Sequence, residues 1–187
     1  MSRSTLSLLE FALLGLVHDH QPCCGYGLRK IFTETPMGRF SDSPGSIYPA
    51  LARLERARLI RGRVENSTAV RRRKVFRLTP SGRSELSRRL ERPITQSDLP
   101  RGMPELALRF AFMESVLGRA ECVRFLQSLA KELAAYIPSL RHHLEVEQTT
   151  NSLSASLAME SGVMSYECYL AWARRAIRRF RQSRSRA

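Results

Sequence analysis

The segments 42-DSPGSIYPALARLERARLI-60 and 70-VRRRKVFRL-78 decide the fold. Ile47, Ala50, Leu51 and Leu54 recur at the i, i+3, i+4 and i+7 spacing of one buried helix face. Strands are expected at 60–64 and 72–78 around a polar turn at 65–68, which makes a two-stranded ribbon. A helix beside a cationic ribbon suits DNA, because the major groove accepts a helix and clustered Arg and Lys release counterions from phosphates.

Pro49 constrains where this helix begins. Proline lacks an amide hydrogen and is comfortable only in the first helical turn, so we expect the N-cap at Gly45 or Ser46 and not at Ser43. This start places Ser46, Tyr48 and Pro49 at the exposed N-terminal tip of the helix, the part of a recognition helix that usually meets base edges. The alternative for the helix residues is a solvated helix face, and the alternative for residues 71–74 is a solvated run of like charges. Because side chains alternate along a strand, two of those four residues point away from the DNA. The candidate DNA contacts are Tyr26, Ser46, Tyr48, Pro49, Arg53, Arg56, Arg71, Arg72, Arg73 and Lys74.

The charge of the chain is large and unevenly distributed. The net charge is +14 over 187 residues. Residues 1–95 hold 18 Lys and Arg against 8 Asp and Glu, residues 96–173 hold 6 against 9, and residues 174–187 hold 7 arginines and no acid. A basic front and tail around an acidic middle favour a polyanion-binding module joined to a second module.

The front of the chain contains three further expected helices. The first runs from a cap at Ser4 or Thr5 to about Asp19, the second from Leu28 to about Glu34, and the fourth opens at Thr79-Pro80-Ser81-Gly82. Three prolines and a glycine between 93 and 104 are typical of a linker. We therefore expect a DNA-binding domain at 1–92, a linker at 93–104 and a helical domain at 105–187.

The helical second half carries two heptad-like seams. Their 4-3-4-3 spacing predicts two helices that pack on each other or on a second copy of the chain, and Pro138, inside the first seam, should kink its helix. The fold class is thus mainly α with a small β-hairpin: a helix-and-ribbon domain followed by an α-helical domain. The candidate dimerisation residues are Leu126, Leu133, Ile137, Leu140, Leu144, Tyr166, Leu170 and Ile177.

Two clusters could bind small ligands. Phe110, Met113, Cys168 and Trp172 make a candidate pocket for a small aromatic or hydrophobic effector, with core packing as the alternative. His18, His20, Cys23 and Cys24 offer metal-binding atoms, but their spacing matches no standard site, so no metal or cofactor is expected. The hydrolase, zinc-protease and P-loop motifs are absent from the sequence, which argues against an enzyme.

The front of the chain resembles the PadR family of winged-helix regulators. The resemblance rests on Leu13-Leu14-Gly15-Leu16, Gly25-Tyr26, the run from Ser43 to Leu51, Arg53-Leu54-Glu55 and the run from Arg73 to Gly82. The chain departs from the family pattern at Gly27, where the family has Glu, and at Ala57-Arg58, where the family has Gly. The second half is similar to the dimerisation domain of the longer members.

The resemblance implies a winged helix-turn-helix domain, an α-helical dimerisation domain and a homodimer on a pseudo-palindromic DNA operator, often a repressor released by a small molecule. No apolar run is long enough for a membrane span, and a cytoplasmic location is the expectation. The alternative is a winged-helix protein-interaction adaptor with only non-specific nucleic-acid affinity. The operator, the regulated genes and the effector are not encoded in any pattern of the sequence.

Overall fold

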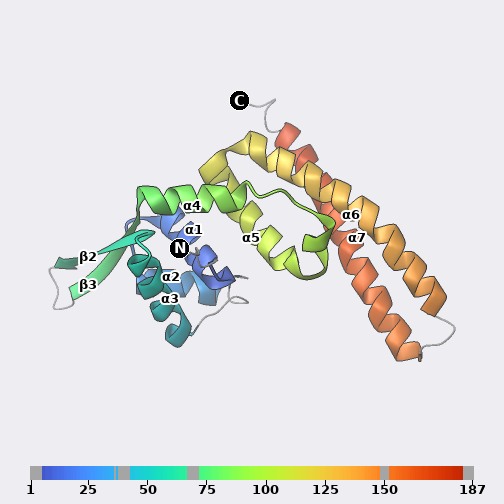
Figure 1. Ribbon diagram of the computed structural model, residues 1–187, viewed down its shortest axis with the longest axis horizontal. Helices are drawn as coiled ribbons and strands as arrows, with labels where there is room; N and C mark the ends of the chain where they lie inside the picture. The colour runs from blue at the N-terminus through green and yellow to red at the C-terminus, as the bar shows by residue number, and fades with distance from the viewer. Residues whose placement is uncertain (1–5, 36, 38–42, 67–71, 148–151, 183–187) are drawn as a thin grey trace. The chain divides into compact units, whose positions relative to one another are not determined.

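The structure, a computed structural model, describes residues 6–35, 37, 43–66, 72–147 and 152–182. The chain divides into two compact units, Met1–Arg92 and Pro93–Ala187, called unit 1 and unit 2 below (Figure 1). No helix among the described residues is both long enough and apolar enough to cross a membrane.

Unit 1 is a winged helix, which confirms the predicted fold class. Its three strands form one antiparallel sheet in the order β1-β3-β2, so the prediction of a two-stranded ribbon was one strand short. The ribbon of β2 and β3 extends beyond the helices, as Figure 1 shows. The elements are α1 (Leu8–His20), β1 (Cys23–Cys24), α2 (Gly25–Glu34), α3 (Pro44–Arg56), β2 (Ile60–Asn66), β3 (Arg72–Leu78) and α4 (Pro80–Leu90).

Helix α1 is the central helix of unit 1. Every residue from Glu10 to Val17 is buried, which is the pattern of a helix covered on all sides. The expected cap at Ser4 or Thr5 was wrong, because Ser7 caps the helix. Its hydroxyl accepts from the amide of Glu10, and the Glu10 carboxylate accepts from the amide of Ser7 at 2.8 Å, a reciprocal capping box.

Strand β1, which follows α1, was not predicted, and helix α2 begins three residues before its predicted start. Cys23 and Cys24 pair with Phe76 and Val75 of β3 as strand β1. Helix α2 begins at Gly25 and not at Leu28, since the sulfur of Cys24 accepts from the amide of Gly27 at 3.5 Å and caps the helix. Strand β2 also runs two residues past the predicted end, to Asn66.

The junction between the ribbon and α4 is tightly packed. Thr79 caps α4, and its hydroxyl donates to the carbonyl of Arg58 at 2.7 Å. Arg58 has φ 58°, a left-handed conformation that disfavours side chains. A Cβ on Gly82 would lie 1.9 Å from the carbonyl oxygen of Leu59, so only glycine fits this position. Close backbone approach therefore fixes how α4 leaves the sheet.

Unit 2 is entirely helical. The expected linker 93–104 was wrong in its second half, because helix α5 begins at Leu99 and includes Pro100 in its first turn, where proline is tolerated. Gly118, with φ 86°, separates α5 from α6. The elements are the 3₁₀ helix η2 (Gln96–Asp98), α5 (Leu99–Leu117), α6 (Arg119–Glu147) and α7 (Leu153–Gln182).

Helices α6 and α7 form a hairpin (Figure 1), and Ile137 of the first seam and Leu170 of the second line the same groove between them. The rings of Tyr136 and Tyr166 meet edge to face at 5.3 Å, and Arg141 pairs with Glu167. The Tyr166 hydroxyl also donates to the carbonyl of Leu99 at 3.4 Å. Contacts within a single chain thus account for much of the heptad pattern.

Candidate nucleic-acid interface

Helix α3 begins earlier than Pro49 suggested. Ser43 is the N-cap and Pro44 the first helical residue, so the prediction of a cap at Gly45 or Ser46 was wrong. The Ser43 hydroxyl accepts from the amide of Gly45 at 3.2 Å, and the Ser43 carbonyl accepts from both Ser46 and Ile47. Pro49 and the Ser43-Pro44 pair predict different helix starts, and the helix follows the Ser43-Pro44 pair. Pro49 lies inside the helix on an exposed face.

The aromatic side chains at the start of α2 and α3 are exposed. Tyr26 is 66% exposed and Tyr48 47% exposed. The ring of Tyr48 lies against Gly25, where a Cβ would come within 2.6 Å of a ring carbon. The Arg29 guanidinium lies 6.0 Å from the Tyr26 ring centroid. Glycine at 25 therefore lets the two helix ends approach, and both tyrosines remain accessible to a partner.

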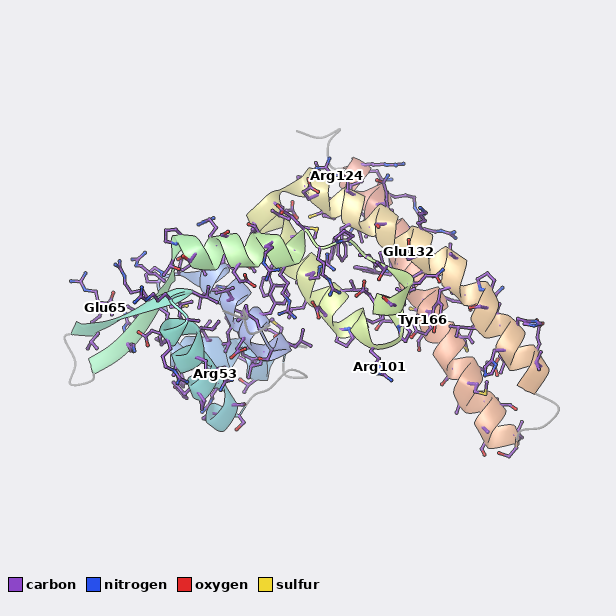
Figure 2. All side chains as sticks on the ribbon, viewed as in Figure 1. Arg53, Glu65, Arg101, Arg124, Glu132 and Tyr166 are labelled. Atoms are coloured by element: carbon purple, nitrogen blue, oxygen red, sulfur yellow. The ribbon has the colours of Figure 1, made fainter. Side chains whose placement is uncertain are left out.

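Arg53 is oriented by a carboxylate from another helix. Its Nε donates to Glu10 Oε1 at 2.6 Å, across 43 residues of sequence, while the other carboxylate oxygen of Glu10 accepts from Ser7; Figure 2 labels Arg53 on α3. Burial raises the pKa of Glu10, but the hydrogen bonds from Arg53 and Ser7 outweigh it, so the pKa lies below its ordinary value. The Arg53 side chain stays about half exposed. One edge of the guanidinium is thus held while the side chain remains accessible.

A second carboxylate connects α3 to the ribbon. Glu55 Oε2 accepts from Lys74 Nζ at 2.6 Å, and Glu55 Oε1 accepts from the amide of Gly62 at 3.1 Å. A Cβ on Gly62 would lie 2.1 Å from the Lys74 side chain. Lys74, a predicted DNA contact, is therefore engaged in an ion pair that fixes the ribbon against the helix.

The ribbon carries arginines that we did not predict as contacts. The register pairs Arg61 with Arg77 directly across the strands and Arg63 with Val75, so Arg61, Arg63 and Arg77 share one face. All three are exposed. Like charges directly opposite destabilise a sheet, and a phosphate between them relieves that repulsion. The alternation of arginine at 61 and 63 within a predicted strand was the available signal.

The remaining predicted contacts have different surroundings. Arg56 and Pro49 are exposed on α3, whereas Ser46 donates its hydroxyl to the Ser43 carbonyl at 3.0 Å. Arg73 lies 3.9 Å from Glu65 across the strands. Arg71 lies outside the described residues, and only the backbone of Arg72 is described.

The His and Cys cluster does not form a metal site in the described part of the chain, where no group of three potential ligands comes together. Burial, reinforced by the neighbouring Cys24, raises the pKa of the Cys23 thiol to about 11. A thiol with so high a pKa is a poor nucleophile and a poor metal ligand at neutral pH.

The candidate effector residues of unit 2 belong to a packed aromatic cluster. The ring of Phe110 meets Trp172 edge to face at 5.3 Å and also contacts Phe125 and Phe180. Met113 is buried, whereas Cys168 is exposed. A cavity of about 420 Å³ lies elsewhere, between α6 and α7, lined by Ala134, Ile137, Pro138, Arg141, Glu167, Leu170, Ala171 and Arg174.

The candidate dimerisation residues divide by burial. Leu126, Leu133 and Ile137 are buried within unit 2 of the single chain. The other predicted members are half-buried on the hairpin: Leu140, Leu144, Tyr166, Leu170 and Ile177. The most exposed large apolar side chains of the hairpin are instead Val146, Leu153, Leu157 and Met164.

Comparison with known proteins finds a family similarity in unit 1. Residues 13–88 match the model of the Transcriptional regulator PadR-like family. A search of the curated proteins found no match. Of the similar solved structures, Bacillus subtilis PadR in complex with operator DNA is 22% identical with a TM-score of 0.45, covering 93% of this chain and 99% of that one. The PadR-like regulator BC1756 from Bacillus cereus is 20% identical with a TM-score of 0.40, covering 94% and 99%. Bacillus subtilis PadR in complex with p-coumaric acid is 23% identical with a TM-score of 0.42, covering 93% and 99%.

Proposed function

We propose that the chain is a PadR-like transcriptional regulator that binds DNA sequence-specifically and acts as a homodimeric repressor, and the match of residues 13–88 to the family model supports this proposal. Helix α3 enters the major groove with Tyr48, Arg53 and Arg56 on its exposed face. The β2–β3 ribbon contacts the phosphate backbone beside it.

The observation that carries this proposal is the arrangement of cations around α3. Arg53 is fixed by Glu10, and the neighbouring ribbon presents Arg61 directly opposite Arg77. A guanidinium that a carboxylate holds in one geometry suits a directional contact to a base or a phosphate. Several exposed arginines close together suit the phosphate backbone of DNA. The combination supports specific DNA binding over general polyanion affinity.

Two copies of the chain are part of the proposal, because a winged helix that reads a pseudo-palindrome needs a second reading helix. The exposed apolar side chains near the α6–α7 connection support a second copy that covers them. Leu126 and Leu133 are less suited to that role, since the hairpin of one chain already buries them. Sedimentation of the full chain, compared with a Leu153→Lys/Leu157→Lys variant, measures whether this end joins two copies.

A small aromatic or hydrophobic effector and a cytoplasmic location complete the proposal. Trp172 is the sole tryptophan and contacts Phe110, so its fluorescence reports on the aromatic cluster. A ligand that quenches this fluorescence and releases DNA at the same concentration supports an effector role. Quenching without release is the result expected of binding unconnected with regulation.

The decisive experiment is capture and sequencing of the fragments that the full chain retains from its source genome. A regulator retains a recurring motif with dyad symmetry and prefers it to bulk DNA by about 10³ or more. The alternative, a winged-helix interaction adaptor with incidental polyanion affinity, shows no such ratio. A recovered motif without dyad symmetry would contradict the homodimer while leaving specific recognition in place.

A further inference from the structure

A second basic surface lies on unit 2, far along the sequence from the reading helix. Arg174, Arg175, Arg178, Arg179 and Arg181 are all exposed on the last turns of α7. At about 100° per residue they occupy one arc of about 160°. Ala173, Ile177 and Phe180, which are buried or half-buried, lie on the other side of the helix. We call these five residues the α7 arginine face.

The α7 arginine face has no acid to neutralise it. Among the described residues, no carboxylate forms an ion pair with any of the five arginines, and the sequence from 168 to 187 contains no Asp or Glu. Like charges four residues apart on a helix, such as Arg174 with Arg178 and Arg175 with Arg179, repel each other. A favourable helix-dipole interaction at the C-terminus offsets this only within the last turn. Water and salt ions screen this repulsion, and a polyanion that binds the five arginines gains the entropy of the counterions it releases.

From this surface we propose that the α7 arginine face binds the phosphate backbone of the DNA on which the protein sits, as a contact separate from α3 and the ribbon. The inference rests on the proposed DNA-binding function. Its contribution is sequence-independent affinity, because guanidinium–phosphate contacts carry no base information.

The density of charge fits a duplex. From Arg174 to Arg181 the helix rises about 10 Å, and a duplex presents about six phosphates over the same axial length. Counting both strands, that is about three phosphates on the strand that faces the helix, so the five cations can meet every facing phosphate. All five are arginine, whose planar guanidinium can bond a phosphate through two nitrogens.

The same surface is poorly suited to a lipid bilayer or to a protein partner. Between Arg174 and Gln182 the arc contains only arginine and Gln182, without an aromatic or large aliphatic side chain to insert into a membrane. Protein interfaces place aromatic or apolar anchors at their centre, and the arc has none. Among phosphate-bearing partners that bind by charge, the proposed DNA-binding function favours duplex DNA.

The test compares full-length variants with the same reduction in charge. One variant carries Arg174→Gln, Arg178→Gln and Arg181→Gln; the control carries Arg101→Gln, Arg124→Gln and Lys131→Gln, three exposed cations of α5 and α6. Binding to a labelled non-specific duplex is measured by anisotropy over a range of salt concentrations. The log–log salt slope should fall by about 0.9 for each phosphate that the variant no longer neutralises. We therefore expect a fall of between about one and three for the α7 variant, and a much smaller one for the control.

A charge-conserving variant separates contact from fold. Arg174→Lys, Arg178→Lys and Arg181→Lys together should keep a salt slope close to that of the parent chain, and the Trp172 unfolding transition should stay unchanged in every variant. An unchanged slope in the glutamine variant, or an equal fall in the control, overturns the proposal. So does a glutamine variant that binds DNA normally but no longer binds phosphatidylserine vesicles. The preference for the captured motif should survive in the α7 variant; absence of any preference in the parent chain would instead refute the proposed function.

Discussion

The cations around α3 and those on α7 are held in different ways. Arg53 and Lys74 each bond a carboxylate from another element, Glu10 and Glu55. The α7 arginine face has no such partner among the described residues. An ion pair restricts a long side chain to one geometry, which favours a directional contact, whereas an unpaired arginine keeps its full charge and its freedom. In the proposed function, unit 1 therefore supplies selectivity and α7 supplies charge.

The largest expected effect comes from a substitution that destabilises unit 1. Gly82→Ala places a Cβ 1.9 Å from the Leu59 carbonyl oxygen, a backbone atom that cannot move aside cheaply. We expect unit 1 to lose about 3 kcal/mol of stability, the upper end of overpacking costs. Because Trp172 lies in unit 2, its fluorescence should report an unchanged transition while far-UV circular dichroism shows an earlier one.

Gly162→Ala is the matched control for that change. No atom lies within 4 Å of a Cβ at this position in α7, and alanine in a helix interior is favoured over glycine by about 0.5–1 kcal/mol. This variant should be slightly more stable. If Gly82→Ala left the circular dichroism transition in place, the junction between the ribbon and α4 would be looser than the close approach requires. At temperatures between the lowered transition of unit 1 and the transition reported by Trp172, preference for the captured motif should vanish in Gly82→Ala while salt-dependent DNA binding persists through α7.

The second prediction concerns the held arginine itself. Arg53→Gln should weaken binding to the captured motif by about 1–3 kcal/mol, the discrimination of one good base contact, and should reduce binding to bulk DNA far less. Competition titrations with the two DNAs measure the ratio. Arg83→Gln, which removes an exposed arginine from α4 of the same unit, is the control and should leave the ratio unchanged. A ratio unaffected by Arg53→Gln would place Arg53 among the backbone contacts.

More of the fold than of the site could be predicted from the sequence. The α3 stripe and the heptad seams are periodic, and periodicity reports burial directly. The start of α3 was missed because Pro49 and the Ser43-Pro44 pair gave opposite local signals, and β1 was missed because two residues carry no period. The Glu10–Arg53 bond joins residues 43 positions apart, and no local pattern marks such a contact.

The third prediction tests a strained position beside the ribbon. Arg58 has φ 58°, and a left-handed conformation costs a side-chain-bearing residue about 1–2 kcal/mol relative to glycine. Arg58→Gly should therefore raise the stability of unit 1 by about 1 kcal/mol, less the added freedom of glycine in the unfolded chain. Urea unfolding followed by circular dichroism measures the change. Ala57→Gly, at φ −73° one residue earlier, should destabilise and serves as the control.

The smallest expected effect is the pH dependence of the Glu10–Arg53 bond. The pKa of Glu10 is lowered in the folded chain, so the carboxylate stabilises the fold at pH values above its ordinary pKa of 4.5. That contribution is lost as the pH falls through the lower, folded pKa. Because Arg53 is half exposed, we expect Glu10→Gln to cost no more than about 1 kcal/mol at neutral pH.

The cost of Glu10→Gln should disappear in acid, where the parent carboxyl is also neutral. Unfolding of the parent and the variant at a series of pH values from neutral downward measures this convergence, and Glu34→Gln, whose parent pairs with Lys30 on an exposed surface, should show little difference at any pH. A cost that stayed constant into acid would mean that Glu10 acts through packing and not through charge. In that case Arg53 would lack the restraint that distinguishes it from the arginines of α7, and the two basic regions would differ in position alone.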